Sequence, residues 1–121
     1  MKQGKQIGWK VITTSTYIDT DQYKYESATN HASNIEYKIG EWVTPLLGNG
    51  PLSVWATKEA ALNFANYYHK TVFKCEYYPS THDKIWYIEN LSWYVCYGIT
   101  DMCYGPDVRL ASTVKLLEEV W

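Results

Sequence analysis

The sequence predicts one α+β domain built from a mostly antiparallel sheet of about five to seven strands, with one main helix packed on one face. Three observations support this prediction. A central segment has the apolar spacing of a helix, several flanking segments alternate with a period of two, and the chain has 121 residues. This length fits a single globular domain over residues 1–121 that needs no disulfide or metal to fold.

The helix is predicted over residues 58–70. Its apolar residues recur at i, i+3, i+4 and i+7, the spacing of one helix face: Ala61, Phe64, Ala65 and Tyr68. Thr57 stands directly before this segment, where its hydroxyl can cap the first turn. We therefore expect the helix to dock on the sheet through Phe64 and Tyr68.

Strands are predicted where apolar and polar residues alternate or where a short apolar run is bounded by turn residues. The alternation is cleanest over residues 35–39, in which Ile35, Tyr37 and Ile39 share one face. In the segment 84–97 the phase of the alternation slips, which a bulge or a turn near residues 89 and 90 would explain. The predicted strands cover residues 7–14, 23–27, 35–39, 52–55, 71–78 and 84–97.

The last segment, residues 108–121, fits two structures. Leu110, Val114 and Leu117 fit a helix, whereas Val108 and Thr113 favour a strand because β-branched residues suit the pleated sheet. We expect a closing strand, with a helix as the alternative.

The charge pattern argues against binding to duplex nucleic acid. The formal net charge is −2, and Arg109 is the only arginine. Proteins that bind the phosphate backbone present clustered lysine and arginine, and the sequence has no such cluster.

The cysteine content and the N-terminus indicate a cytoplasmic protein. Three cysteines are too few for a secreted disulfide framework. The segment MKQGKQIGWK lacks the apolar core of a signal peptide, and no apolar run is long enough to cross a membrane.

No motif predicts a catalytic centre, a metal site or a cofactor. The histidines are isolated from one another, and P-loop and dinucleotide fingerprints are absent from the sequence. Cys75 is expected in the core, and Cys103 in a loop is the better nucleophile candidate, although a passive thiol is favoured for it too.

Five short segments resemble a group of small uncharacterised proteins encoded by bacteriophages and mobile gene cassettes: GWKVI, IEYKIGEWV, LSVWATKEAALNFA, VFKCEYY and RLASTVKLLEEV. The resemblance implies a mixed sheet with one main helix packed on it and a bacterial or phage cytoplasmic setting. It implies no activity for any residue.

The aromatic content of 17%, with 12 Tyr and 6 Trp, is the strongest functional signal. Two irregular connections, residues 40–51 and 98–107, would bring aromatic rings to one end of the sheet. Such rings could line a concave site for a planar or sugar-like ligand, fill the core, or form a homodimer interface. The candidate residues are Trp42, Trp55, Trp93, Tyr97 and Tyr104.

These observations favour a binding or interaction module with an unknown protein partner or a small planar ligand. The alternative is a small enzyme acting on a nucleotide-like or sugar-like ligand. ADP-ribosyltransferase-like chemistry is a remote alternative, because the arginine of those enzymes comes early in the chain whereas Arg109 comes nearly last.

Overall fold

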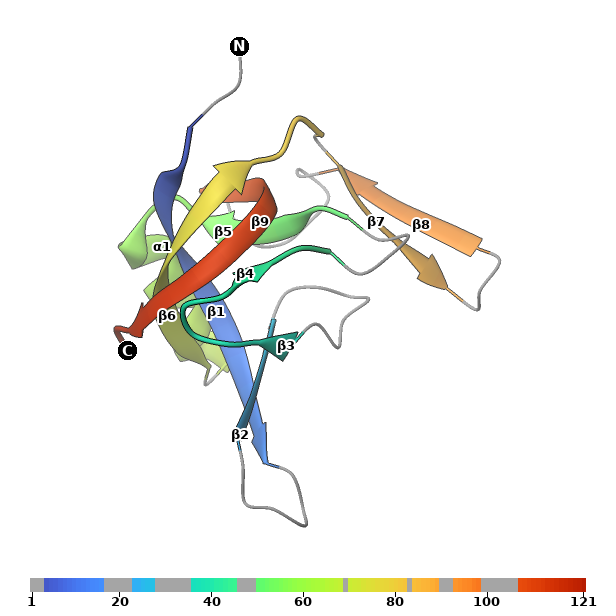
Figure 1. The fold of residues 1–121 in the computed structure, drawn as a ribbon. Coiled ribbons are helices and arrows are strands. Elements are labelled where there is room, and N and C mark those ends of the chain that lie inside the picture. The colour runs from blue at the N-terminus through green and yellow to red at the C-terminus, as the bar shows by residue number, and fades with distance from the viewer. Residues whose placement is uncertain are drawn as a thin grey trace.

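A computed structural model of the chain describes residues 4–16, 23–27, 36–45, 50–68, 70–82, 84–89, 93–98 and 107–121. Within these ranges the chain forms one helix and nine strands (Figure 1). The elements are β1 (Gln6–Thr16), β2 (Tyr23–Ser27), β3 (Glu36–Tyr37), β4 (Trp42–Val43), β5 (Leu52–Trp55), α1 (Lys58–Tyr68), β6 (Thr71–Pro79), β7 (Lys84–Glu89), β8 (Trp93–Gly98) and β9 (Val108–Glu119).

The centre of the fold is a small closed barrel. Hydrogen bonds join the strands in the order β3-β2-β1-β5-β9-β4, and β6 pairs with both β1 and β9. Since β1 and β9 also both pair with β5, the four strands β1, β5, β9 and β6 form a closed ring of antiparallel pairs. The α+β class is confirmed, but the expected mostly antiparallel sheet of about five to seven strands is wrong, because the centre of the fold is a closed barrel of four strands. The sheet closes because β6 pairs along both of its edges.

The length and curvature of β9 make this closure possible. One edge of β9 pairs with β5 and then with β4, while the other edge pairs with β6. Between Tyr78 and Pro79 the partner on β9 moves from Thr113 to Ala111, and a second register shift occurs farther along the same pair. Such bulges bend and twist a strand, and β9 (red) curves strongly across the barrel in Figure 1. The expected closing strand in the last segment is confirmed.

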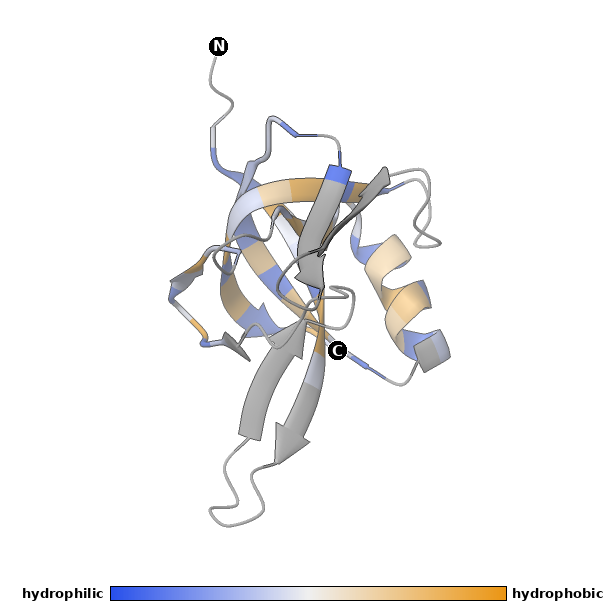
Figure 2. Cartoon of the chain, turned by 90° about the vertical axis from the view of Figure 1, so that its right-hand side faces the viewer, coloured by the Kyte–Doolittle hydropathy of each residue, from blue (hydrophilic) through white to orange (hydrophobic). Residues whose placement is uncertain are grey.

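Two hydrophobic clusters lie on opposite sides of the barrel wall, because successive residues of a strand point to opposite faces. Hydrophobic and hydrophilic segments alternate along the barrel strands in Figure 2, and α1 stands beside them. The interior cluster contains Ile12, Tyr37, Leu52, Val54, Phe73, Cys75, Tyr77, Ala111, Val114 and Leu116. The cluster beneath α1 contains Val11, Trp55, Ala61, Ala65, Val72, Val108 and Leu110.

The helix begins and docks as the spacing predicts. The Ala60 backbone N–H donates to Thr57 Oγ1 at 3.3 Å, which confirms the N-cap. Phe64 packs against Trp55 of β5, with the ring centroids 4.9 Å apart. The helix ends at Tyr68, before the predicted end at residue 70. The other predicted docking residue is Tyr68, whose side chain lies outside the described part of the structure.

Two predicted strands differ from the observed ones. The segment 84–97 is predicted as one strand, but it holds two strands, β7 and β8, which pair antiparallel from Lys84 and Gly98 to Glu89 and Trp93. The expected bulge or turn near residues 89 and 90 falls partly outside the described residues. The predicted strand over 35–39 is shorter, because the chain turns at Gly40, whose φ is 85°. As a result Tyr37 is buried while Ile39, which lies beyond the end of β3, is 50% exposed.

Candidate functional site

The five aromatic residues singled out from the sequence do not form one described cluster. Trp42 on β4 is 41% exposed, whereas Trp55 on β5 is fully buried beneath α1. Trp93 and Tyr97 belong to β8, and their side chains lie outside the described part of the structure. Tyr104 also falls outside the described residues. Trp55 is therefore a core residue, and Trp42 is the candidate whose exposed ring the structure describes.

Trp42 lies at one end of a row of directly paired residues that crosses four strands. Ile7 of β1 pairs with Glu76 of β6, Glu76 with Lys115 of β9, and Lys115 with Trp42 of β4. Residues directly opposite on antiparallel strands project from the same face with Cβ atoms about 5 Å apart. These four side chains thus form a continuous outer surface of the barrel, with apolar residues at its ends and an ion pair between them.

A second exposed ring packs beside Trp42. Tyr78 of β6 is 40% exposed, and its ring centroid lies 5.3 Å from that of Trp42 with an interplanar angle of 37°. Lys115 Nζ lies 5.0 Å from the Trp42 ring centroid, within the range of a cation–π interaction. The Trp42 ring is thereby held by two neighbours while much of its surface remains open to solvent.

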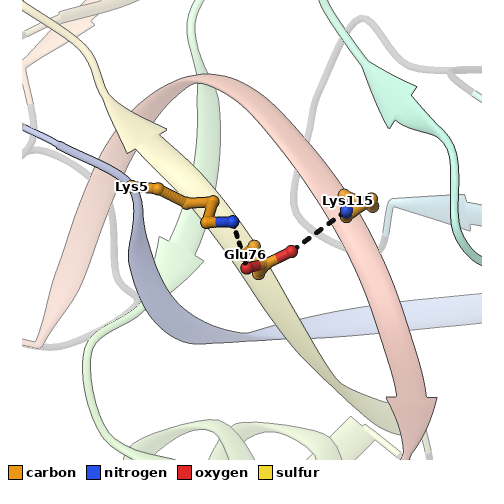
Figure 3. Close-up of polar contacts among 3 residues, drawn as sticks. All are labelled: Lys5, Glu76 and Lys115. Carbon is orange, nitrogen blue, oxygen red and sulfur yellow. Dashed lines mark ion pairs between the residues drawn. The ribbon is translucent and has the colours of Figure 1, made fainter.

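Two lysines, Lys5 and Lys115, converge on the carboxylate of Glu76 (Figure 3). Lys5 Nζ lies 2.9 Å from Glu76 Oε2, and Lys115 Nζ lies 3.1 Å from Glu76 Oε1. Hydrogen bonds from Lys5 and Lys115 lower the pKa of Glu76, and the same contact raises the pKa of Lys5. The carboxylate therefore stays ionised and fixes both ammonium groups in place.

We use the name outer patch for six residues on this face: Lys5, Ile7, Trp42, Glu76, Tyr78 and Lys115. Sequence reasoning identified only Trp42 among them as a site candidate. The signal for two others was present, because the two-residue period of segment 71–78 already placed Glu76 and Tyr78 on the same side of the strand. The pairing across β9 and β4 could not be seen without the tertiary structure.

A second polar group lies inside the barrel. Lys10 is fully buried, and its Nζ donates a hydrogen bond to the Ser53 backbone oxygen at 2.5 Å. The same Nζ lies 5.6 Å from the centroid of the Tyr37 ring. Burial lowers the pKa of Lys10 to about 7, because the interior solvates an ammonium group poorly.

Neither Lys10 nor its neighbour Cys75 is placed to react with a substrate. Burial raises the pKa of the Cys75 thiol to about 12, although the nearby Lys10 opposes this shift. Cys75 thus remains a protonated core residue, as the sequence predicts, because the reactive form of cysteine is the thiolate. A deprotonated amine can act as a nucleophile, but the complete burial of Lys10 separates it from any substrate. We therefore assign Lys10 a structural role.

The described residues contain no group of three or more His, Cys, Asp or Glu side chains placed to hold a metal ion. Within the same residues, no helix has the length and apolar character needed to span a membrane. No protein-family model, curated protein or solved structure matches the chain.

Proposed function

We propose that this protein is a non-enzymatic binding module that recognises a protein partner through the outer patch. It would act in a bacterial cytoplasm as an accessory protein of a bacteriophage or mobile element, a setting that rests on the sequence resemblance alone. The observation that carries the binding role is the contact between two exposed rings, Trp42 and Tyr78, 5.3 Å apart on the barrel surface.

The residue types of the outer patch support this proposal. Tryptophan and tyrosine are the side chains that most often dominate the energy of a protein interface, because each buries a large apolar area. Charged residues commonly surround such rings at the rim, and Lys5, Glu76 and Lys115 adjoin them here. Ile7, which is 46% exposed, adds an aliphatic contact at the far end of the row.

The geometry of the patch also favours binding. Trp42 is packed between Tyr78 and Lys115, and Lys115 is in turn held by Glu76. Side chains that are already ordered lose less conformational entropy when a partner binds. The patch is therefore arranged for recognition before any partner arrives.

The proposal is tested by capturing partners from a bacterial host with the wild-type chain and with a Trp42→Ala, Tyr78→Ala double variant. The control is Tyr67→Ala, which removes a 77% exposed ring from α1 and leaves the outer patch intact. We expect a specific partner to be retained by the wild type and the control but lost by the double variant. The interaction is then measured again with both purified proteins. Equal capture by the folded double variant would contradict the proposal.

A second candidate function is binding of a small planar or sugar-like ligand, with or without catalysis, because exposed tilted rings next to a carboxylate can stack on such molecules. A panel of sugars and nucleotides, followed by thermal unfolding, distinguishes this alternative from a protein interface. A ligand that binds only the folded protein adds about 2.7 kcal/mol to the free energy of unfolding when its concentration is about 100 times its dissociation constant. A ligand-induced rise in the unfolding temperature that is lost in Trp42→Ala would favour a small ligand. The molecular mass of the protein in solution would reveal a homodimer.

A further inference from the structure

We infer that the partner of the outer patch is an acidic protein segment, whose carboxylate binds to Lys5 and Lys115 while an adjacent apolar side chain rests on Trp42 and Tyr78. This inference rests on the proposed function, since it names the chemistry of the partner at the same surface.

The charge balance of the patch is the first reason. Two ammonium groups meet one carboxylate, so the triad of Lys5, Glu76 and Lys115 carries one net positive charge. The 121 residues together have a formal net charge of −2. The patch is thus locally positive on an acidic protein, and complementary charge at an interface guides both partner choice and association rate.

The exposure of the three charged side chains is the second reason. Lys5 is 45% exposed and Lys115 is 24% exposed, whereas Glu76 between them is only 15% exposed. An approaching partner therefore meets the ammonium groups first. Each ammonium has three donor hydrogens, so both lysines can bind another carboxylate in addition to Glu76 or in its place.

The position of the rings relative to the lysines is the third reason. Lys115 contacts both Glu76 and the face of Trp42, and Tyr78 packs on the same tryptophan. A partner that presents a carboxylate next to an aromatic or aliphatic side chain would satisfy both parts of the patch together. Ile7 offers a further apolar contact on the other side of Glu76.

A nucleic acid is the less favourable partner. Single-stranded nucleic acids bind along positively charged grooves that contact several successive phosphates while bases stack on aromatic rings. The outer patch has rings but only two lysines, and a carboxylate stands between them. The exposed Ile7 also suits a protein side chain better than a phosphate.

The inference is tested with the full chain by NMR titration of backbone amides, using two capped tripeptides as probes: acetyl-Glu-Trp-Glu-amide and acetyl-Lys-Trp-Lys-amide. We expect the acidic peptide to bind at least about fivefold more tightly than the basic one, a difference on the scale of exposed ion pairs. The amides of Trp42, Glu76 and Lys115 should shift. Added salt should weaken the acidic complex because it screens exposed charges.

Two variants and a control make the test specific. Glu76→Gln removes the internal competitor and should tighten binding of the acidic peptide severalfold, whereas Lys115→Met should weaken it severalfold. Lys58→Met removes an exposed lysine from the start of α1 and should leave the affinity unchanged. If Glu76 had only a structural role, Glu76→Gln would not tighten binding. This variant therefore distinguishes a structural role from competition between Glu76 and the peptide carboxylate for the two lysines.

Equal affinities for the two peptides, or no shifts with the acidic one, would overturn the inference. Tighter binding of an octathymidylate than of the acidic peptide would overturn it in favour of a nucleic acid. If the acidic peptide fails while capture of a cellular partner still depends on Trp42 and Tyr78, the inference fails and the proposed function stands. If capture does not depend on these rings, the proposed function itself fails.

Discussion

Lys10 Nζ donates a hydrogen bond to the backbone oxygen of Ser53 across the inside of the barrel, at 2.5 Å. This contact joins β1 to β5, the two barrel strands whose pairing is limited to Trp9 and Trp55. The long side chain of Lys10 therefore adds a hydrogen bond at the place where the ring of strands has few backbone contacts. Burial of an amine also makes the stability of the barrel depend on pH.

The first prediction concerns this pH dependence. Burial lowers the Lys10 pKa from 10.5 to about 7, so from about pH 7 upward the unfolded chain binds more protons at this residue than the folded chain does. The free energy of unfolding should therefore rise with pH, by at most about 1.4 kcal/mol per pH unit. Cys75 acts in the opposite direction above pH 9, because burial raises its pKa from 9.0 to about 12.

The rise should thus be clearest between pH 7 and pH 9, below the ordinary pKa of the cysteine thiol. Urea denaturation at several pH values measures it, and Lys10→Met is the control variant because it fills a similar volume without an ionisable group. Between pH 7 and pH 9 we expect the free energy of unfolding to rise more steeply with pH in the wild type than in Lys10→Met. Identical slopes in the two proteins would show that Lys10 does not titrate with a lowered pKa.

The second prediction concerns Gly8, where β1 passes close to Tyr77. A Cβ atom on Gly8 would lie 2.8 Å from Tyr77 Cε1 and 3.1 Å from the Trp55 backbone oxygen. Gly8→Ala should lower the free energy of unfolding by about 1–3 kcal/mol, the usual cost of overpacking a core. Gly4→Ala is the matched control, since no atom lies within 4 Å of the added Cβ there. Equal denaturation midpoints for the two variants would refute the close approach.

The third prediction concerns the docking of α1. Phe64→Ala removes the ring that packs on Trp55 at 4.9 Å and should destabilise the protein by about 3 kcal/mol. Tyr67→Ala removes a ring of similar size from the exposed side of the same helix, so it should change stability by about 0.5 kcal/mol or less. Thermal unfolding of both variants measures the difference. A loss in Tyr67→Ala as large as that in Phe64→Ala would mean that the helix docks through another face.

The fourth prediction concerns the start of the helix. Thr57 Oγ1 accepts the Ala60 backbone N–H at 3.3 Å and lies 3.4 Å from Asp107 Oδ2. Thr57→Ala removes the cap and should cost about 1 kcal/mol of stability. Thr57→Ser keeps an oxygen at the same position and should recover most of the loss. Chemical denaturation of the two variants decides whether the hydroxyl or the methyl group of Thr57 matters.

Local periodicity explains why much of the secondary structure was predictable. The spacing of Ala61, Phe64 and Ala65 marks one helix face, and the structure packs that face on the barrel. The inward position of Cys75 followed in the same way from the two-residue period of its strand. These features depend on contacts between near neighbours in sequence, so a single segment contains enough information to indicate them.

The candidate site was less predictable, because it depends on which strands become neighbours. The outer patch unites Ile7, Glu76, Lys115 and Trp42, which lie on four different strands. Nothing in any one of these strands indicates the other three. Trp55 shows the same limit, since its aromatic ring suggested a ligand site and its neighbours in space place it in the core beneath α1.

The sequence by itself determined the α+β class, the capped helix and the alternating faces of the strand over residues 71–78, because these follow from residue periods of 3.6 and two. Only the tertiary structure decided that β6 closes the sheet into a barrel, that Lys10 is buried inside it, and that two lysines meet Glu76 beside exposed rings. The physical reason is that barrel closure depends on the bulges and register of β9, which bring distant segments together and leave no periodic signal within any of them.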